Sequence, residues 1–524
     1  MRKSLSIAAA AILAAAVVPA PAGAQGTPLW VQHVQNYPGG ISNGVRAKLA
    51  AGTLASSATA ALATATKPNV QMSDETSQDR PTNETAVALN PANPQIAIAS
   101  ANDYNVPNGL WIGRTMNGGQ TWTSLHKGAT DSKGQHCVGS DPSVVYSVRD
   151  QAFYLSTLCF FFVNPTSEVQ IWKSVDNGLS WTPSNQAATV ISNITSRGVD
   201  DSVFYDKELL AVDNNVGSTH YGRLYITFIK FHLLPNAFSD FCPVQLAFTD
   251  SVPTENPAAA VWQHTPVVPD RPQDNGVGPG ANQFATPVVD SAGGLDIAYM
   301  LEECNTALDH GHFFKRSTDG GVTLSSTVAI DHPGEYADNP DLGDVLPNKN
   351  FRAPDAPSIA FNAATGRLEY VYQNNIKMAT SGADISFQQS SDFGKHWSHA
   401  KFISVTSSGA PAPNDQYEAS IAADESGHLH AIWYDNRNDP GNKLIQTFQA
   451  LSTDDGMTWT NVNISTTQWN PDLSFFKSGA FIGDYTWIAA SNTVCYPTWT
   501  DGRNTSGPPN GETDAFTNIE AGCS

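Results

Sequence analysis

The octet S-S-D-F-G-K-H-W at residues 390–397 is one of five related strings in this chain. The others are T-M-N-G-G-Q-T-W at 115–122, S-V-D-N-G-L-S-W at 174–181, S-T-D-G-G-V-T-L at 317–324 and S-T-D-D-G-M-T-W at 452–459. The interval between the second and third copies is about twice the others, and residues 248–262 lie where a degenerate copy is expected. A string that recurs in this way indicates a fold built from repeated units.

Each octet has the residues of a tight turn between two outer strands. Its Ser or Thr and its Asp or Asn can accept hydrogen bonds from the turn's own backbone, and Gly allows a positive φ. In four of the five copies a Trp can pack its ring under the turn. A turn that uses its polar groups internally has few left for a substrate, so we interpret the octet as scaffolding and not as a catalytic signature.

A second series of segments runs in step with the octets. Seven stretches of alternating apolar residues, each interrupted by a short turn, begin at Asn83, Asp141, Asp206, Gln283, Asp355, Asp415 and Gly483. Each is typical of a hairpin of two buried strands. Together they predict an all-β fold, a β-propeller of four-stranded antiparallel blades. We expect seven blades, with six as the alternative if one hairpin is an insertion, and a strand near Asn69 that closes the ring.

The N-terminal part of the chain has the features of export. Residues 1–24 combine a basic start, an alanine-rich apolar run and a small-residue cleavage motif, which predicts a signal peptide. Residues 25–68 are rich in Ala, Ser and Thr and predict a leader or linker, and residues 69–524 predict a single propeller domain. We therefore expect an exported, extracellular or periplasmic protein without membrane insertion.

Charge and cysteine content narrow the partners further. The chain has 28 Lys and Arg against 49 Asp and Glu, and its net charge of -21 argues against a nucleic-acid partner. We expect a monomer. Six cysteines without close Cys-x-x-Cys spacing predict disulfides in an exported chain. Sequence proximity suggests the pairs Cys137–Cys159, Cys242–Cys304 and Cys495–Cys523.

Acidic residues recur near the starts of the inner hairpins. They are Glu84, Asp141, Asp206, Glu208, Asp355, Glu418 and Asp484. In a propeller these starts converge on one face, so the carboxylates could form a ring at a central mouth, with raised pKa values, basic partners or a cation. Two of them could act as acid and base in glycoside cleavage, or Ca²⁺ could occupy the mouth. Alternatively, each caps backbone N–H groups of its own strand. We assign no other cofactor and no metal ligand.

Several motifs resemble those of a known superfamily. The S-x-D-x-G-x-x-W turns resemble the Asp-boxes, or BNR repeats, of sialidases, and "NETAVALNPANP", "AIWYDNRNDP", "FIGDY" and "PTWTDGR" resemble secreted bacterial exo-α-sialidase-like proteins. The resemblance covers residues 84–516. It implies three arginines that hold a substrate carboxylate, a tyrosine nucleophile assisted by a glutamate, and an aspartate acid/base. The family's Arg-Ile-Pro-like motif has no match here, and its catalytic domains have six blades.

The resemblance implies a set of site residues. The catalytic candidates are Tyr485, Asp484, Glu418 and Glu84, and the substrate-binding candidates are Arg352, Arg437, Arg503, Asp141 and Asp355. Each also has a structural interpretation. Tyr485 could be a packed aromatic at a strand end, and Arg352 could be a surface residue paired with Asp355. Arg437 and Arg503 each follow a Trp-x-Asp unit and could form structural Asp–Arg pairs.

Three functions remain open from the sequence. The first is a secreted sialidase-like glycoside hydrolase that acts on exposed glycans at the central mouth. It predicts that Tyr485, arginines and at least one carboxylate converge. The second is a non-catalytic propeller that binds carbohydrate or protein. The third is a structural envelope or matrix protein, which predicts no convergent polar site.

Overall fold

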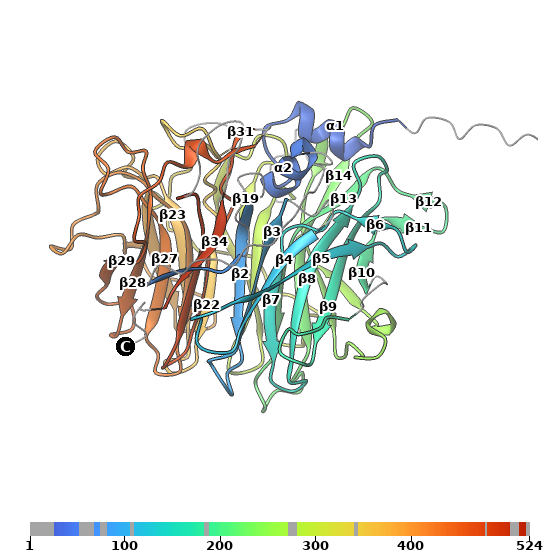
Figure 1. The fold of residues 1–524 in the computed structure, drawn as a ribbon, viewed down its shortest axis with the longest axis horizontal. Helices are drawn as coiled ribbons and strands as arrows, with labels where there is room; N and C mark the ends of the chain where they lie inside the picture. Colours follow the sequence, from blue (N-terminus) through green and yellow to red (C-terminus); the bar gives the residue numbers. More distant parts are fainter. Residues whose placement is uncertain are drawn as a thin grey trace, which may run out of the picture.

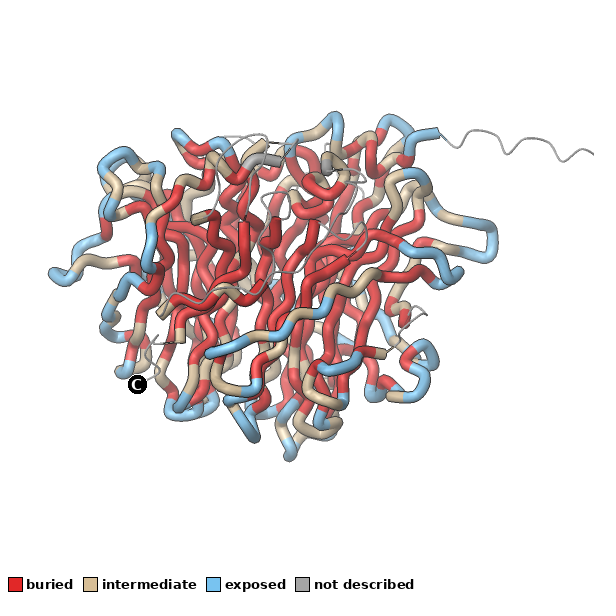
Figure 2. The backbone as a smooth tube through the Cα atoms, viewed as in Figure 1, coloured by how far each residue is buried: buried red, intermediate tan, exposed pale blue. Residues whose placement is uncertain are grey.

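Seven antiparallel blades surround one axis in this protein (Figure 1). The computed structural model describes residues 26–51, 68–73, 81–104, 109–182, 188–270, 280–339, 344–476, 479–503 and 513–519. The predicted all-β propeller with seven blades is confirmed, and the six-bladed alternative is wrong. Figure 2 shows that the strands are largely buried and that the exposed residues lie mainly in the connections at both ends of the blades.

The first four blades follow one another along the chain. Blade 1 contains β2 (Thr82–Leu89), β3 (Ala97–Asp103), β4 (Gly109–Thr115), β5 (Thr123–Thr130) and the short β6 (His136–Cys137). Blade 2 contains β7 (Ser143–Ser147), β8 (Ala152–Phe160), β9 (Ser167–Ser174) and β10 (Thr189–Ser192). Blade 3 contains β13 (Val203–Val212), β14 (Leu224–Leu233), β16 (Val244–Thr249) and β17 (Gln263–Pro266), with β15 (Ser239–Phe241) beside β14. Blade 4 contains β18 (Gln283–Val289), β19 (Leu295–Glu302), β20 (Asp309–Ser317) and β21 (Val328–Ala329).

The last three blades complete the ring. Blade 5 contains β22 (Ser358–Asn362), β23 (Arg367–Asn374), β24 (Asp384–Ser390) and β25 (Lys401–Phe402). Blade 6 contains β26 (Gln416–Ala423), β27 (Leu429–Asp435), β28 (Gln446–Ser452) and β29 (Thr460–Asn463). Blade 7 contains β32 (Trp487–Ala490), β33 (Cys495–Asp501), β34 (Asp514–Asn518) and β1 (Asn69–Gln71). Small elements in the connections are β11 (Ile194–Thr195), β12 (Gly198–Val199), β30 (Phe475–Phe476), β31 (Gly479–Ala480), η1 (Pro257–Ala259) and η2 (Pro471–Leu473).

The innermost strands line the axis and close into a ring. Each innermost strand contacts the innermost strand of the next blade, in the order β2, β7, β13, β18, β22, β26 and β32, and β32 contacts β2. In blade 7, β1 pairs antiparallel with β34, with Asn69 opposite Asn518. A strand from the start of the chain therefore completes a blade formed by its end, and the predicted closure near Asn69 is confirmed.

The five octets form the turns between the third and fourth strands of their blades. In every copy the hydroxyl of the first residue accepts a hydrogen bond of 2.8–3.0 Å from the N–H of the glycine four residues later. The Asp or Asn at the third position accepts one of 2.8–3.1 Å from the N–H four residues after it. The turns satisfy their own polar groups, which confirms their interpretation as scaffolding.

Two of the predicted disulfides are confirmed. Cys137–Cys159 joins β6 to β8 across blades 1 and 2, with Cα atoms 5.4 Å apart. Cys242–Cys304 joins the connections that follow β15 and β19, with Cα atoms 5.9 Å apart. The third predicted pair, Cys495–Cys523, includes a residue outside the described ranges. Both observed bonds therefore connect neighbouring blades.

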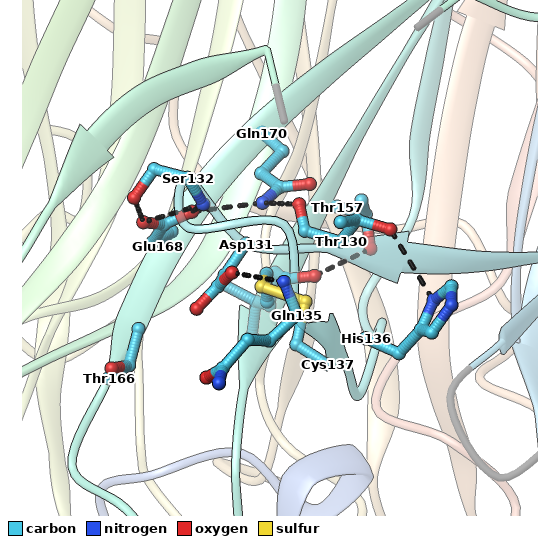
Figure 3. The surroundings of a disulfide bond; sticks show 12 residues. Thr130, Asp131, Ser132, Gln135, His136, Cys137, Thr157, Thr166, Glu168 and Gln170 are labelled. Atoms are coloured by element: carbon cyan, nitrogen blue, oxygen red, sulfur yellow. Dashed lines mark hydrogen bonds between the residues drawn. A yellow bond between two sulfur atoms is a disulfide. The ribbon is translucent and has the colours of Figure 1, made fainter. Parts of the chain in front are cut away.

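The loop before Cys137 is anchored on the neighbouring blade (Figure 3). The side-chain amide of Gln170 donates to the carbonyl oxygen of Thr130 at 2.9 Å, and the Ser132 N–H donates to Glu168 at 3.2 Å. In each of these hydrogen bonds, the donor and the acceptor lie on opposite sides of the junction between blades 1 and 2. The disulfide and these hydrogen bonds thus hold the same junction.

Two helices cover one end of the propeller, at the top of Figure 1. They are α1 (Leu29–Asn36) and α2 (Asn43–Ala51). Trp30 stacks on Phe204 with ring centroids 5.0 Å apart and meets Phe160 edge-on at 5.4 Å. Ile41 and Val45 are completely buried. Each large apolar side chain buried here stabilises the fold by about 1.5–3 kcal/mol.

These helices correct the predicted domain boundary. The composition of residues 25–68 predicted a loosely ordered leader and a folded body starting near Asn69. That prediction overlooked the apolar residues around Trp30, which are numerous enough to bury a face against the blades. Residues 29–51 belong to the folded body. The predicted signal peptide and residues 52–67 lie outside the described ranges, and no helix within those ranges has the length and apolar character needed to cross a membrane.

Candidate active site at the propeller axis

The innermost strands of five blades have a residue in the left-handed backbone region, either within the strand or just before it. These residues are Glu84 (φ 57°), Asp141 (φ 54°), Lys207 (φ 52°), Phe284 (φ 48°) and Glu418 (φ 55°). In β2, β13, β18 and β26 the pairing register shifts at the same place. Bulges redirect side chains, and strained non-glycine residues of this kind cluster at functional sites. The repeated distortion thus turns charged side chains towards the axis.

Lys207 is the positive centre of this site, and the sequence interpretation did not single it out. Its Nζ lies 2.7 Å from Asp484 Oδ2, 3.5 Å from Glu84 Oε1 and 3.6 Å from Asp141 Oδ2. The side chain is only 3% exposed. In the string D-K-E at 206–208, we assigned a role at the axis only to the two acidic residues. A basic residue between two acidic ones at the start of an inner hairpin could have indicated that Lys207 belongs to the site.

Arg352 is the second buried cation. Its Nε lies 2.9 Å from Asp344 Oδ2 and 3.8 Å from Asp484 Oδ1, and its Nη2 lies 3.4 Å from Glu302 Oε1. Its Nη1 has no hydrogen-bond partner among the described residues. The alternative of a surface pair with Asp355 is therefore wrong. Glu302 and Asp344 were not predicted, because neither stands at the start of an inner hairpin.

The carboxylates are not local caps of their own strands. Glu84 accepts a hydrogen bond of 3.2 Å from the Asp484 N–H, and Asp206 accepts one of 2.6 Å from the Ser42 N–H. Both oxygens of Glu418 are buried and have no hydrogen-bond partner within the described part of the chain, and the same holds for Glu208. Donors distant in the chain, or none among the described residues, replace the local N–H groups that capping would require.

The surroundings push the pKa values of these acids in opposite directions. Burial, reinforced by Asp484 and Glu84, raises the pKa of Glu418 well above its usual range, and burial also raises that of Glu84. Burial, with the charge of Asp141, raises the pKa of Asp206 to about 7. Burial acts the same way on Asp484, but Lys207 and Arg352 outweigh it, so its pKa is lowered. Neutral acids and an ionised carboxylate therefore lie side by side.

A small cavity runs along the axis beside these groups. Its lining includes Asp141, Lys207, Glu208, Phe284, Glu418 and Tyr485. It has room for about one water molecule. The hydroxyl oxygen of Tyr485 is buried without a hydrogen-bond partner in the described structure, and its ring centroid lies 5.3 Å from Lys207 Nζ. Burial, followed by the charge of Glu84, raises the pKa of Tyr485.

The structure does not bring Arg437 and Arg503 to this cluster. Arg437 Nη2 lies 2.7 Å from Asp435 Oδ2 and Arg503 Nη2 lies 2.6 Å from Asp501 Oδ2. Each guanidinium also lies over the ring of a phenylalanine in its own blade. The two Trp-x-Asp units thus form the structural Asp–Arg pairs that the sequence allowed. Asp355 also lies apart, in a separate acidic group described below.

Helix α2 begins directly over the axial carboxylates. Besides the hydrogen bond from Ser42 to Asp206, a Cβ atom placed on Gly44 would lie only 2.6 Å from oxygens of Asp141 and Glu84. Glycine therefore allows the backbone to approach the carboxylates this closely. The positive end of a helix also stabilises negative charge. Residues 29–51 thus close the mouth of the site.

Comparisons with known proteins were made for the whole chain. No protein-family model and no curated protein matches it. Trypanosoma rangeli sialidase in complex with sialic acid is 14% identical with a TM-score of 0.43, covering 76% of this chain and 56% of that one. Hadza microbial sialidase Hz136 is 11% identical with a TM-score of 0.41, covering 80% and 72%. Penicillium chrysogenum alpha-L-arabinanase complexed with arabinobiose is 12% identical with a TM-score of 0.41, covering 86% and 98%. Similarity at this level carries no argument about activity.

Proposed function

We propose that the protein is an exported, monomeric, sialidase-like glycoside hydrolase that cleaves glycans at the axial site. One observation carries the proposal. Glu418 and Asp484, whose pKa values shift in opposite directions, line the same cavity as Tyr485, whose hydroxyl has no hydrogen-bond partner among the described residues. Glycoside cleavage needs a neutral acid and an ionised carboxylate near the same bond. Two disulfides support an oxidising compartment.

Each group has a chemical role in the proposed reaction. The Tyr485 oxygen attacks the anomeric carbon while the glycosidic C–O bond breaks, and Glu418 gives its proton to the leaving oxygen. Asp484, whose lowered pKa keeps it ionised, accepts the phenolic proton, while Glu84, whose pKa is raised, stays neutral beside it. Water then cleaves the bond between Tyr485 and the sugar. A neutral tyrosine suits an anionic sugar because it adds no repulsion.

The buried cations support an anionic sugar as substrate. Arg352 Nη1 has no acceptor among the described residues, and a guanidinium matches a carboxylate in geometry and charge. Lys207 adds a second positive charge beside Asp141. The resemblance to sialidases suggested three arginines for this role. Here one arginine and one lysine would share it.

Substrate entry requires residues 29–51 to leave the mouth. A sugar ring is far larger than the axial cavity, which has room for about one water molecule. The proposed enzyme is therefore latent with this segment in place, and cleavage within the Ala/Ser/Thr-rich stretch 52–67 would release it. The open and closed forms can be compared directly.

The test compares the mature chain with a version that carries a protease site within residues 52–67. After cleavage and removal of the released segment, verified by mass, both forms are assayed with a fluorogenic α-sialoside and a panel of other glycosides. We expect turnover mainly by the cleaved form. Tyr485→Phe and Glu418→Gln should each lower kcat by about 100-fold or more.

Tyr225→Phe is the matched control. Tyr225 is also buried and its hydroxyl also lacks a hydrogen-bond partner in the described structure, but it lies on β14 outside the cavity lining. It should retain full turnover. If the cleaved, folded chain hydrolyses no glycoside of the panel, the hydrolase proposal fails. Glycan binding without turnover would then establish the non-catalytic carbohydrate-binding alternative.

A further inference from the structure

A second acidic group lies where blade 4 meets blade 5. Oxygen atoms of Asp309, Asp338 and Asp355 all lie within 4.8 Å of one another. Asp309 begins β20, Asp338 lies in the connection between the blades, and Asp355 precedes β22. Asp309 is 4% exposed and Asp355 is completely buried, whereas Asp338 is partly buried. Three carboxylates from separate segments therefore meet in a nearly enclosed place.

The Asp309 carboxylate receives no hydrogen bond within the described part of the chain. The Asp309 backbone N–H instead donates to Asp338 Oδ2 at 2.9 Å, so the neighbouring acid is satisfied and Asp309 is not. Burying a carboxylate without hydrogen-bond donors costs free energy. A positively charged ligand would offset this cost.

The remaining contacts of the group come from neutral donors. The Tyr336 hydroxyl donates to Asp355 Oδ2 at 2.7 Å, and the Asn375 amide donates to Asp355 Oδ1 at 3.4 Å. The Asn375 oxygen is buried and has no hydrogen-bond partner in the described part of the chain. These contacts orient Asp355 without neutralising it. The group therefore has an excess of oxygen atoms and of negative charge.

The donor atoms select the kind of cation. All are oxygens, which favours a hard ion such as Ca²⁺ over Zn²⁺, which prefers nitrogen and sulfur. The imidazole of His312, which approaches Asp355, is already engaged: its Nδ1 lies 3.0 Å from Asp331 Oδ2 and its Nε2 lies 3.4 Å from the Asp355 carbonyl oxygen. Ca²⁺ binds oxygens at about 2.3–2.6 Å, so ligands on opposite sides of the ion are about 4.8 Å apart. Three oxygens that lie within 4.8 Å of one another can therefore bind the same ion.

We propose that Asp309, Asp338 and Asp355 bind a Ca²⁺ ion, with the amide oxygen of Asn375 as a fourth ligand. The ion would link the third strand of blade 4, the connection and the first strand of blade 5. The site differs from the axial mouth, where the Lys207 ammonium lies among the carboxylates. It also gives Asp355 a metal-binding role in place of the substrate-binding role implied by the resemblance.

The test uses the mature, full-length chain after treatment with EDTA and removal of the chelator. CaCl₂ is titrated by isothermal calorimetry, and Tm is followed as a function of Ca²⁺ concentration. We expect saturable binding of one ion per chain and a Tm that rises with Ca²⁺, because an ion that binds only the folded state stabilises it. Asp309→Asn should weaken binding by about tenfold or more, because it removes a charged ligand.

Two variants locate the ion. Glu369→Gln removes another buried carboxylate, on β23 and outside the acidic group, and should leave the affinity unchanged. Glu418→Gln at the axis should also leave it unchanged. A loss of binding in Glu418→Gln would place the ion at the axis and overturn the proposal.

Other outcomes would also overturn it. These are the absence of a Ca²⁺-dependent heat or Tm change in the stripped protein, equal affinity in Asp309→Asn, and equal or tighter binding of Mg²⁺ or Zn²⁺. If Asp309→Asn does not fold, Asp338→Asn provides the same test at a partly exposed ligand, where the cost of the substitution to folding is smaller.

Discussion

Lys207 holds together carboxylates that would otherwise repel one another. Its ammonium lies within 3.6 Å of oxygens of Asp484, Glu84 and Asp141. All four groups are buried, so water does not screen their charges. Removing one member of such a buried network leaves uncompensated charge behind, which costs more than the net stabilisation of the intact network. At the scale of a residue, this lysine makes the acidic axis compatible with folding.

Lys207→Met should therefore lower the free energy of unfolding by about 3–5 kcal/mol at neutral pH. Urea unfolding followed by tryptophan fluorescence measures the change. The loss should shrink at lower pH, because Glu84, whose pKa burial raises, binds a proton more readily there. Lys230→Met is the control, because its pair with Asp270 is partly exposed and should be worth no more than about 1 kcal/mol. Equal losses in the two variants would contradict the role of Lys207.

A strand of three residues closes the propeller. β1 is short, but the side chain of Asn69 adds contacts across the junction of blades 6 and 7. Its amide donates to the Ile464 carbonyl oxygen at 2.6 Å, and its Oδ1 accepts from the Thr466 N–H at 2.6 Å and from Arg503 Nη2 at 3.0 Å. At the scale of an element, Arg503 therefore helps to anchor the closing strand.

Asn69→Ala should lower the free energy of unfolding by about 1–3 kcal/mol, because the Thr466 N–H and the Arg503 guanidinium lose an acceptor, whereas the Ile464 carbonyl oxygen keeps its hydrogen bond from the Asn518 amide. Denaturant titration of the variant and the parent chain gives the value. Asn438→Ala removes a single side-chain hydrogen bond at an exposed position and should change stability by less than about 1 kcal/mol. A loss for Asn69→Ala no greater than that of the control would show that ring closure does not depend on this side chain.

Buried acids make the stability of the whole molecule depend on pH. The groups around Asp206 are the Ser42 N–H, which donates to it, and the charges of Asp141 and Lys207, yet burial dominates and raises its pKa from 3.8 to about 7. Burial also raises the pKa of Glu418. Between pH 4 and 7 the folded state binds more protons at Asp206 than the unfolded state does. The contribution of Asp206 to stability therefore falls as the pH rises through this range, and buried His33, whose pKa is lowered from 6.5 to about 4, opposes it in part.

We expect Tm to be lower at pH 8 than at pH 5.5 by several degrees, measured by scanning calorimetry with EDTA in every buffer. The lowered pKa of Asp484 acts below pH 4 and does not oppose this trend. Asp206→Asn should flatten the slope, because an amide does not titrate. A Tm that rises steadily from pH 5.5 to pH 8 would show that the buried acids are ionised at little cost in the folded protein.

The site was only partly predictable for a physical reason. Glu84, Asp141, Glu418, Asp484 and Tyr485 were expected at the axis because each stands at the start of an inner hairpin. Glu302 ends β19, and Asp344 lies in the connection between blades 4 and 5. Only the folded structure brings these two residues close to the axial site. Arg437 and Arg503 occupy suitable places in the sequence, but the nearest carboxylate of each lies in its own Trp-x-Asp unit.

The sequence by itself determined the blade architecture of this protein, because turns and strand alternation depend on residues close together in the chain. It also indicated the closing strand, because a blade with three strands needs a fourth. Only the tertiary structure decided which charges pair. Lys207 and Asp484 are 277 residues apart, and a backbone bulge sets the direction of the lysine side chain. The two helices over the mouth were also not predictable from the sequence. Helices this short become stable only when their apolar faces pack against the surface of the blades.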